Sequence, residues 1–168
     1  NEKPGPGRFR EFLQFDADYV GTKSLRADAE LCVMVSEILE KCGLNKEEYI
    51  IKISSRKITE ELFKKINIDN NEQKLIALRA LDKIDRLGWD GVKQLLGEGR
   101  KDKSGDFTQG ANLSSSNIDI IEKELGKKLP ETEDLLEILK IFNDYDFINY
   151  EFDPSIIRGL EYYTGPIF

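Results

Sequence analysis

The sequence of 168 residues has no histidine and only two cysteines, Cys32 and Cys42. Both cysteines lie in a segment whose apolar residues follow a helical period, and about ten residues of helix would separate them by about 15 Å. That distance is too long for a disulfide bond or for joint binding of one metal ion. We therefore expect two free thiols, a reducing compartment such as the cytoplasm, and no zinc site.

Long apolar runs and an excess of positive charge are also missing. No stretch of about 18 apolar residues occurs, so we expect no membrane-spanning helix. The first residues, Asn1 to Gly7, lack the apolar core of a secretory signal. The formal net charge is −7, which argues against broad binding of nucleic acid, although a few well-placed arginines suffice for a local phosphate site.

Apolar periodicity and turn residues predict strands alternating with helices. Strands are expected at 8–20, 49–53, 147–153 and 162–168, and helices at 27–42, 55–66, 70–87, 89–96, 117–125 and 131–143. Ser55 is the expected N-cap of the second helix, and Gly43 and Gly88 are expected to end helices. The stretch 97–116, rich in glycine, serine and charge, is expected to be a loop with one helical turn.

This order predicts an α/β (α+β) domain interrupted by an all-helical insertion. The domain would consist of residues 1–66 and 145–168, and the insertion would occupy 67–144. The composition, 39% apolar and 34% charged, is sufficient for a buried core and a soluble surface.

The first predicted strand carries candidate ligand-binding side chains. Side chains alternate between the two faces of a strand, so the odd-numbered residues from Phe9 to Tyr19 would form a mostly apolar face toward the core. The even-numbered face is polar and holds Arg8, Arg10, Phe12, Gln14, Asp16, Asp18 and Val20. Arginines bind phosphate or carboxylate oxygens bidentately, and an aromatic ring stacks on a base. An ordinary strand with one solvated face explains the same pattern, and the pattern alone favours that interpretation.

A second candidate group lies between Arg158 and Gly165. An arginine precedes a glycine, and the paired tyrosines Tyr162 and Tyr163 follow before the second glycine. Tyrosine hydroxyls and an arginine on a flexible backbone suit recognition of a small polar ligand. A β-hairpin with tyrosines on its surface is the alternative explanation.

Taken together, residues 2–18 and 158–165 resemble the histidyl-tRNA synthetase family. The first stretch is similar to the second signature motif of class II aminoacyl-tRNA synthetases. The second resembles the family's histidine-binding signature, with Glu161 where the family usually has Asp. The helices between them match the family's insertion domain in place and size. The resemblance implies a class II antiparallel-sheet catalytic domain.

The resemblance also implies an activity and its partners. The full-length protein would be a homodimeric ligase that uses ATP and Mg²⁺ to convert L-histidine to histidyl-adenylate and then transfers it to tRNA(His). Several family motifs are missing: the arginine that stands two positions before Glu2, the first and third motifs, and the anticodon-binding domain. We therefore expect this sequence to be a fragment that does not charge tRNA alone.

The first motif implies residues for ATP and for the amino acid. Glu2 would bind the adenine amino group, and Phe12 would stack on the adenine ring. Arg8 would hold the ATP phosphate or the substrate carboxylate, with Arg10 supporting the strand or the phosphates. Gln14 would bind the amino-acid head group.

The resemblance assigns the imidazole and the reacting phosphate to other residues. Asp18 and Tyr163 would recognise the imidazole ring, and Tyr162 would line the same pocket. Arg158 would act at the reacting phosphate, so Arg158 and Arg8 are the candidate catalytic residues. No residue is assigned to a metal.

Two further interpretations remain at this point. A regulatory synthetase-like subunit of ATP phosphoribosyltransferase shares the fold and a similar Tyr-Tyr-Thr-Gly stretch, but generally lacks the helical insertion. Basic residues of the helices are candidates for contact with tRNA, although a solvated face explains them as well. They are Lys64, Lys65, Lys83, Arg86, Arg100, Lys101 and Lys103.

Overall fold

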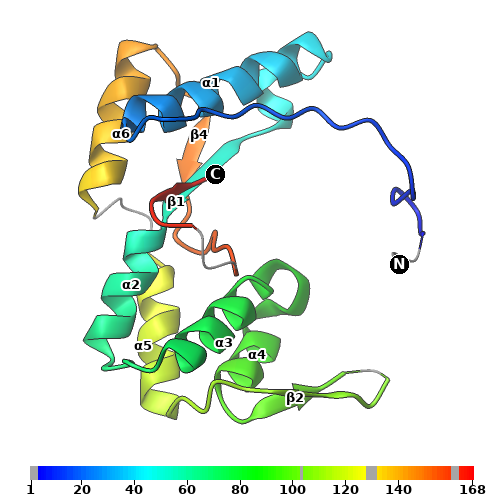
Figure 1. Ribbon diagram of the computed structural model, residues 1–168, viewed down its shortest axis with the longest axis vertical. Helices are drawn as coiled ribbons and strands as arrows, with labels where there is room; N and C mark the ends of the chain where they lie inside the picture. The colour runs from blue at the N-terminus through cyan, green and yellow to red at the C-terminus, as the bar shows by residue number, and fades with distance from the viewer. Residues whose placement is uncertain (1–3, 103, 128–131, 160–162) are drawn as a thin grey trace.

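The computed structural model describes residues 4–102, 104–127, 132–159 and 163–168 (Figure 1). Its helices are α1 (Leu25–Lys41), the 3-10 turn η1 (Lys46–Glu48), α2 (Arg56–Lys65), α3 (Asn71–Leu81), α4 (Ile84–Leu96), α5 (Ser115–Leu125) and α6 (Glu133–Asp144). Its strands are β1 (Ile51–Ser55), β2 (Gly99–Lys101), β3 (Phe107–Gln109), β4 (Tyr150–Phe152) and β5 (Pro166–Ile167). The mixed α/β class predicted from the sequence is confirmed. None of the described helices is long and apolar enough to cross a membrane.

A small mixed sheet with two helices forms one part of the molecule. The strand order is β4-β1-β5, with β1 parallel to β4 and antiparallel to β5. Helices α1 and α6 pack on each other and on this sheet, at the top of the molecule in Figure 1. Their shared apolar cluster consists of Ala29, Cys32, Ile51, Ile53, Leu135, Ile138, Phe142, Phe147 and Phe152.

The second apolar cluster lies among α2, α3, α4 and α5. These helices form the lower part of the molecule, from which the hairpin of β2 and β3 projects (Figure 1). Side chains cap the start of several helices, as Ser55 does for α2, where it accepts a hydrogen bond from the backbone N–H of Lys57. Gly43 follows α1 with a φ of +99°, as expected for the residue after a helix end.

The boundaries predicted for the helical insertion, 67–144, stay a prediction. The packing of the described residues favours a different division, because α2 shares its core with α3, α4 and α5. Helix α6 instead packs with α1 and β1.

The single helix predicted at 70–87 is wrong. Helix α3 ends at Leu81 and α4 begins at Ile84, so the chain folds back between them. Folding back places Leu78 of α3 and Leu95 of α4 in one buried cluster, which one straight helix would not do. The interruption predicted at Gly88 is present: this residue has non-helical backbone angles, with a φ of +64°, and kinks α4.

The loop with a helical turn predicted at 97–116 is also wrong, because β2 and β3 form an antiparallel hairpin there. The glycines of this stretch permit close backbone pairing. A side chain at Gly110 would collide with the carbonyl oxygen of Gly97, and Gly99 has a φ of +127°. The glycines of this stretch thus permit contact between two strands and do not make it a flexible loop.

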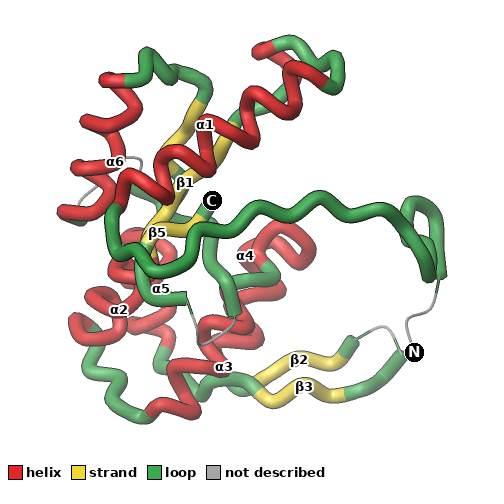
Figure 2. The backbone as a smooth tube through the Cα atoms, turned by 45° about the horizontal axis from the view of Figure 1, so that its top comes forward, coloured by secondary structure: helices red, strands yellow, loops and turns green. Residues whose placement is uncertain are grey.

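The strand predicted at 8–20 is wrong too. Apart from one isolated bridge between Gly5 and Arg8, this stretch is an extended, exposed arm (Figures 1 and 2). The odd-numbered side chains are not in a core: Phe15, for example, is 74% exposed. A strand requires a neighbour to satisfy its backbone N–H and C=O groups. Among the described residues, no strand runs beside residues 9–20.

Candidate functional site

A groove of about 810 Å³ brings together the two motifs that are far apart in the sequence. Asp18, at the end of the arm, and Tyr163, in the second motif, both line it. Its other walls are the first turns of α1 and α6 and the last residues of the chain. Figure 2 shows the end of the arm passing beside β5 and the C-terminus.

The end of the arm is fixed to α1 next to Asp18. The hydroxyl of Tyr19 donates a hydrogen bond of 2.6 Å to the carboxylate of Glu30. The hydroxyl of Tyr145, which follows α6, donates to the same carboxylate at 2.9 Å. Hydrogen bonds from Tyr19, Tyr145 and Arg26 lower the pKa of Glu30, so it remains a charged acceptor. This network holds Asp18 at the rim of the groove.

The groove is acidic. Five carboxylate side chains and only two lysines, Lys23 and Lys57, line it. The carboxylates belong to Asp18, Asp28, Glu133, Asp134 and Glu137. Such an excess of carboxylate favours a ligand that carries positive charge or N–H donors.

Asp134 is the buried carboxylate of the groove, with 3% of its surface exposed. Ser55 Oγ donates a hydrogen bond of 2.7 Å to Asp134 Oδ2, and Lys57 Nζ lies 3.6 Å from the same oxygen. The backbone N–H of Leu135 donates to Oδ1 at 3.0 Å. Burial acts to raise the pKa of Asp134, but the side chain of Thr132, the hydrogen bonds from Ser55 and Leu135 and the charge of Lys57 together lower it. Asp134 therefore links α6 to the junction of β1 and α2.

Replacing Asp134 by asparagine is expected to destabilise the fold in a pH-dependent way. A carboxyl whose pKa is lowered by folding stabilises the protein above its unfolded pKa, and that stabilisation is lost as the pH falls through the folded pKa. We expect Asp134→Asn to cost about 1.5–3 kcal/mol at neutral pH. The difference from the parent protein should shrink below about pH 4.

Urea unfolding of both proteins at several pH values would measure this difference. Asp119→Asn, an exposed site on α5, is the matched control and should show little loss at any pH. A constant difference between parent and Asp134→Asn across the whole pH range would contradict the role of the charge.

The other residues predicted for the site do not line this groove. Arg8, Arg10, Phe12 and Gln14 lie along the exposed arm, where Gln14 Nε2 donates to Asp16 Oδ1 at 2.8 Å. Glu2 and Tyr162 lie outside the described residues.

Arg158 lines a neighbouring hollow of about 640 Å³ beside β1 and the start of α4. Phe168 lines both this hollow and the groove. The structure thus brings Asp18 and Tyr163 together and places Arg158 in the adjoining hollow.

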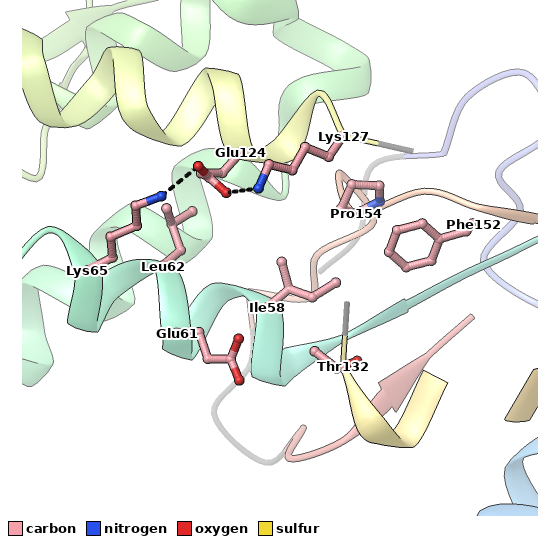
Figure 3. A pocket seen from close by; sticks show the side chains of 9 residues that line it. All are labelled: Ile58, Glu61, Leu62, Lys65, Glu124, Lys127, Thr132, Phe152 and Pro154. Atoms are coloured by element: carbon pink, nitrogen blue, oxygen red, sulfur yellow. Dashed lines mark hydrogen bonds and ion pairs between the residues drawn. The ribbon is translucent and has the colours of Figure 1, made fainter. Parts of the chain in front are cut away.

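A smaller hollow of about 220 Å³ lies among α2, α5 and β4 (Figure 3). In it, Glu124 accepts hydrogen bonds from Lys127 and Lys65, each at 2.7 Å. These contacts lower the pKa of Glu124 to about 2. Lys65, a candidate for tRNA contact, therefore has an acidic partner between two helices.

Three residues of the groove region were missed by the sequence analysis: Ser55 in its bond to Asp134, Lys57, and Asp134 itself. A lysine and an aspartate in the first turns of amphipathic helices look like solvated residues. No pattern in the sequence marks Asp134 as buried, because its burial depends on how α6 packs against β1.

A family model described as "Histidyl-tRNA synthetase" matches residues 1–168. The chain belongs to the histidyl-tRNA synthetase family. It is 44% identical over 193 aligned positions to the histidine–tRNA ligase of Bartonella henselae, covering 100% of this chain and 39% of that protein. The ligase of Rhodopseudomonas palustris is also 44% identical, over 201 positions, covering 100% of this chain and 40% of that protein.

Two consequences follow from these comparisons. The chain spans about two fifths of the length of these synthetases. The alignments are longer than the 168 residues of this chain, so the relatives carry residues within the matched region that this chain lacks.

The fold is also that of a solved synthetase. The crystal structure of histidyl-tRNA synthetase from Nostoc sp. PCC 7120 is similar, with a TM-score of 0.68 at 20% identity. The similarity covers 86% of this chain and 36% of that structure. At this identity the likeness concerns the fold alone.

Proposed function

We propose that the protein containing this chain is a histidine–tRNA ligase, which activates L-histidine with ATP and transfers it to tRNA(His). The observation that supports this proposal is the groove shared by Asp18 and Tyr163. A carboxylate and a phenol hydroxyl are the partners that an imidazole ring with one N–H donor and one nitrogen acceptor requires.

The groove would select histidine by its polar groups. A site whose polar groups hydrogen-bond the substrate disfavours analogues that lack the bonding atoms, because those polar groups would lose their partners. Asp18 would accept from the ring N–H, and Tyr163 would bond the second nitrogen. The remaining carboxylates of the groove would favour the positively charged amino group of the amino acid.

ATP would be bound by the arm and by the hollow next to the groove. Phe12 would stack on adenine, with Glu2 at its amino group, while Arg8 and Arg158 would neutralise charge on the phosphates. Gln14 would reach the head group of histidine, and Tyr162 would complete its pocket. Because the arm is exposed at Arg8, Phe12 and Gln14, other parts of the full-length protein would have to pack on it.

Magnesium would enter with ATP, as the metal complex of the substrate. Among the described residues, no group of three or more metal-ligating side chains could hold a metal ion. Magnesium therefore has no proposed protein ligand among these residues.

The ligase is favoured over the regulatory subunit of ATP phosphoribosyltransferase. The most similar relatives given above are named histidine–tRNA ligase, and the chain has the helical block that the regulatory subunit generally lacks. A homodimer in the cytoplasm and tRNA contact by the basic helices are proposed from the resemblance alone.

Histidine-dependent exchange of pyrophosphate into ATP tests the function in the full-length protein. We expect exchange with histidine and none with phenylalanine. Asp18→Asn is expected to raise the KM for histidine about 10- to 100-fold, because a hydrogen bond to a charged group contributes about 1.5–3 kcal/mol. The KM for ATP should change little.

Tyr163→Phe removes only a hydroxyl and should give a smaller rise in the KM for histidine. Asp119→Asn, which removes a carboxylate from the exposed face of α5, is the control. Absence of histidine-dependent exchange in the parent protein would refute the proposed activity, and an unchanged histidine KM in Asp18→Asn would remove Asp18 from the pocket.

A further inference from the structure

Arg56 is a buried arginine at the junction of the two parts of the molecule. It is the first residue of α2 and directly follows β1, and only 8% of its surface is exposed. Burying a charged side chain is unfavourable unless hydrogen bonds compensate for the lost water. The hydrogen bonds of Arg56 therefore indicate its role in the structure.

Those contacts hold both ends of the second motif. The backbone N–H of Arg56 donates a hydrogen bond of 2.8 Å to the carbonyl oxygen of Gly165. Its guanidinium Nη1 donates at 2.9 Å to the carbonyl oxygen of Arg158. Thr59 in turn donates to the carbonyl oxygen of Arg56 at 2.8 Å, which fixes the start of the helix.

The flanks of the motif belong to different parts of the fold. Ile157 is buried in the cluster of α2 to α5, and a side chain added at Gly159 would lie 3.4 Å from the backbone of Arg79 in α3. Ile167 pairs with Ser54 in the sheet. The described ends of the motif thus lie against the helical block and the sheet, and Arg56 contacts both ends.

We propose that Arg56 is a positioning residue for the histidine site, fixing the spacing between Arg158 and Tyr163 and connecting the helical block to that site. This proposal rests on the proposed ligase function, since the two residues would act on the reacting phosphate and on the imidazole. Arg158 and Tyr163 line different hollows, so each must be held in place for the two to act on one substrate.

The chemistry of arginine suits this role. The backbone N–H of any residue except proline at position 56 can bond Gly165, but the bond to Arg158 requires a long side chain with a directed donor. Arginine presents a planar fork of N–H donors, whereas lysine presents one compact charge with freely rotating donors. Arg56→Lys should therefore retain part of the function and Arg56→Gln less.

Kinetics of the full-length protein give the first test. We expect Arg56→Gln to raise the KM for histidine and to lower kcat/KM for histidine by about 100-fold, the loss typical of a displacement of about 1 Å at a reacting centre. Arg56→Lys should fall between Arg56→Gln and the parent. Lys123→Gln, an exposed position on α5 that loses the same charge, is the control and should match the parent.

A substitution that only destabilises the fold would reduce the amount of active enzyme. It would lower kcat and leave the KM for histidine unchanged, so an unchanged KM in Arg56→Gln would overturn the proposal. Recovery of the histidine KM in Arg56→Lys, at the same melting temperature as Arg56→Gln, would support it.

Hydrogen exchange gives a second test that does not depend on activity. In Arg56→Gln, amides of residues 157–159 and 163–168 should exchange at least about tenfold faster, while those of α6 keep their parent rates. Equal acceleration in both regions would indicate global loosening and overturn the proposal. If the parent protein showed no histidine-dependent pyrophosphate exchange, the proposed ligase function would be refuted. The hydrogen-exchange rates of the amides would then decide by themselves whether Arg56 holds the two ends of the motif.

Discussion

Replacing Arg158 by alanine is expected to lower the rate of histidyl-adenylate formation by about 100- to 1,000-fold, the usual cost of removing one group that stabilises charge in a transition state. In the proposed reaction, charge would build up on the α-phosphate as the histidine carboxylate attacks. A fixed guanidinium neutralises that charge without reorganisation. Histidine-dependent pyrophosphate exchange in the full-length protein measures the loss.

The fold should tolerate this change. The side chain of Arg158 is exposed, and its backbone carbonyl is held by Arg56, so alanine removes little buried surface. We expect the melting temperature to stay close to that of the parent. Lys140→Ala, which removes a positive charge from an exposed position on α6, should retain full activity, and unchanged exchange in Arg158→Ala would exclude this residue from the mechanism.

The position of Arg158 outside the groove agrees with such a role. The imidazole and the carboxylate lie at opposite ends of histidine. Residues that recognise the ring and a residue that acts at the phosphate should therefore line adjoining hollows rather than one. Phe168 lies at the boundary of the two hollows here.

Helices with local signals could be predicted from the sequence. The segment that forms α1 has apolar residues at helical spacing and Gly43 after its end, and Ser55 caps α2. These features act within a few residues, so they do not depend on the rest of the fold. Helix α5 was likewise found to within a few residues of its observed bounds.

Elements that depend on distant partners could not be predicted. The aromatic residues of 8–20 favour a strand, yet a strand forms only beside another strand, and none of the described ones lies there. The hairpin of β2 and β3 is the opposite case: its composition is typical of a loop, yet its two strands form because they pair with each other. The break between α3 and α4 also comes from packing rather than from a strong helix-ending residue.

The residues of the candidate site show the same difference between local signals and contacts with distant residues. The motifs that contain Asp18 and Tyr163 could be recognised from neighbouring residues, and the structure places these two side chains in one groove. The contributions of Arg56 and Asp134 have no such local pattern. Each depends on hydrogen bonds to residues far away in the sequence, with Arg158 and Ser55 respectively.

Replacing Phe142 by alanine is expected to have the largest effect on stability, a loss of about 3–5 kcal/mol in the free energy of unfolding. Phe142 in α6 is fully buried. Its ring centroid lies 4.8 Å from those of both Phe147 and Tyr150, so removing the ring takes away aromatic contacts as well as buried area. Phe142→Leu, which fills more of the space, should cost about 1.5 kcal/mol or less.

Urea unfolding of the purified chain measures both losses. Leu136→Ala is the control on the same helix, because that side chain is 46% exposed and its truncation should change the free energy by at most about 0.5 kcal/mol. Equal losses for Phe142→Ala and Leu136→Ala would contradict the packing of α6 against α1 and β1. The groove would then lack its support, since the first turn of α6 brings Asp134 to it only while this core holds the helix in place.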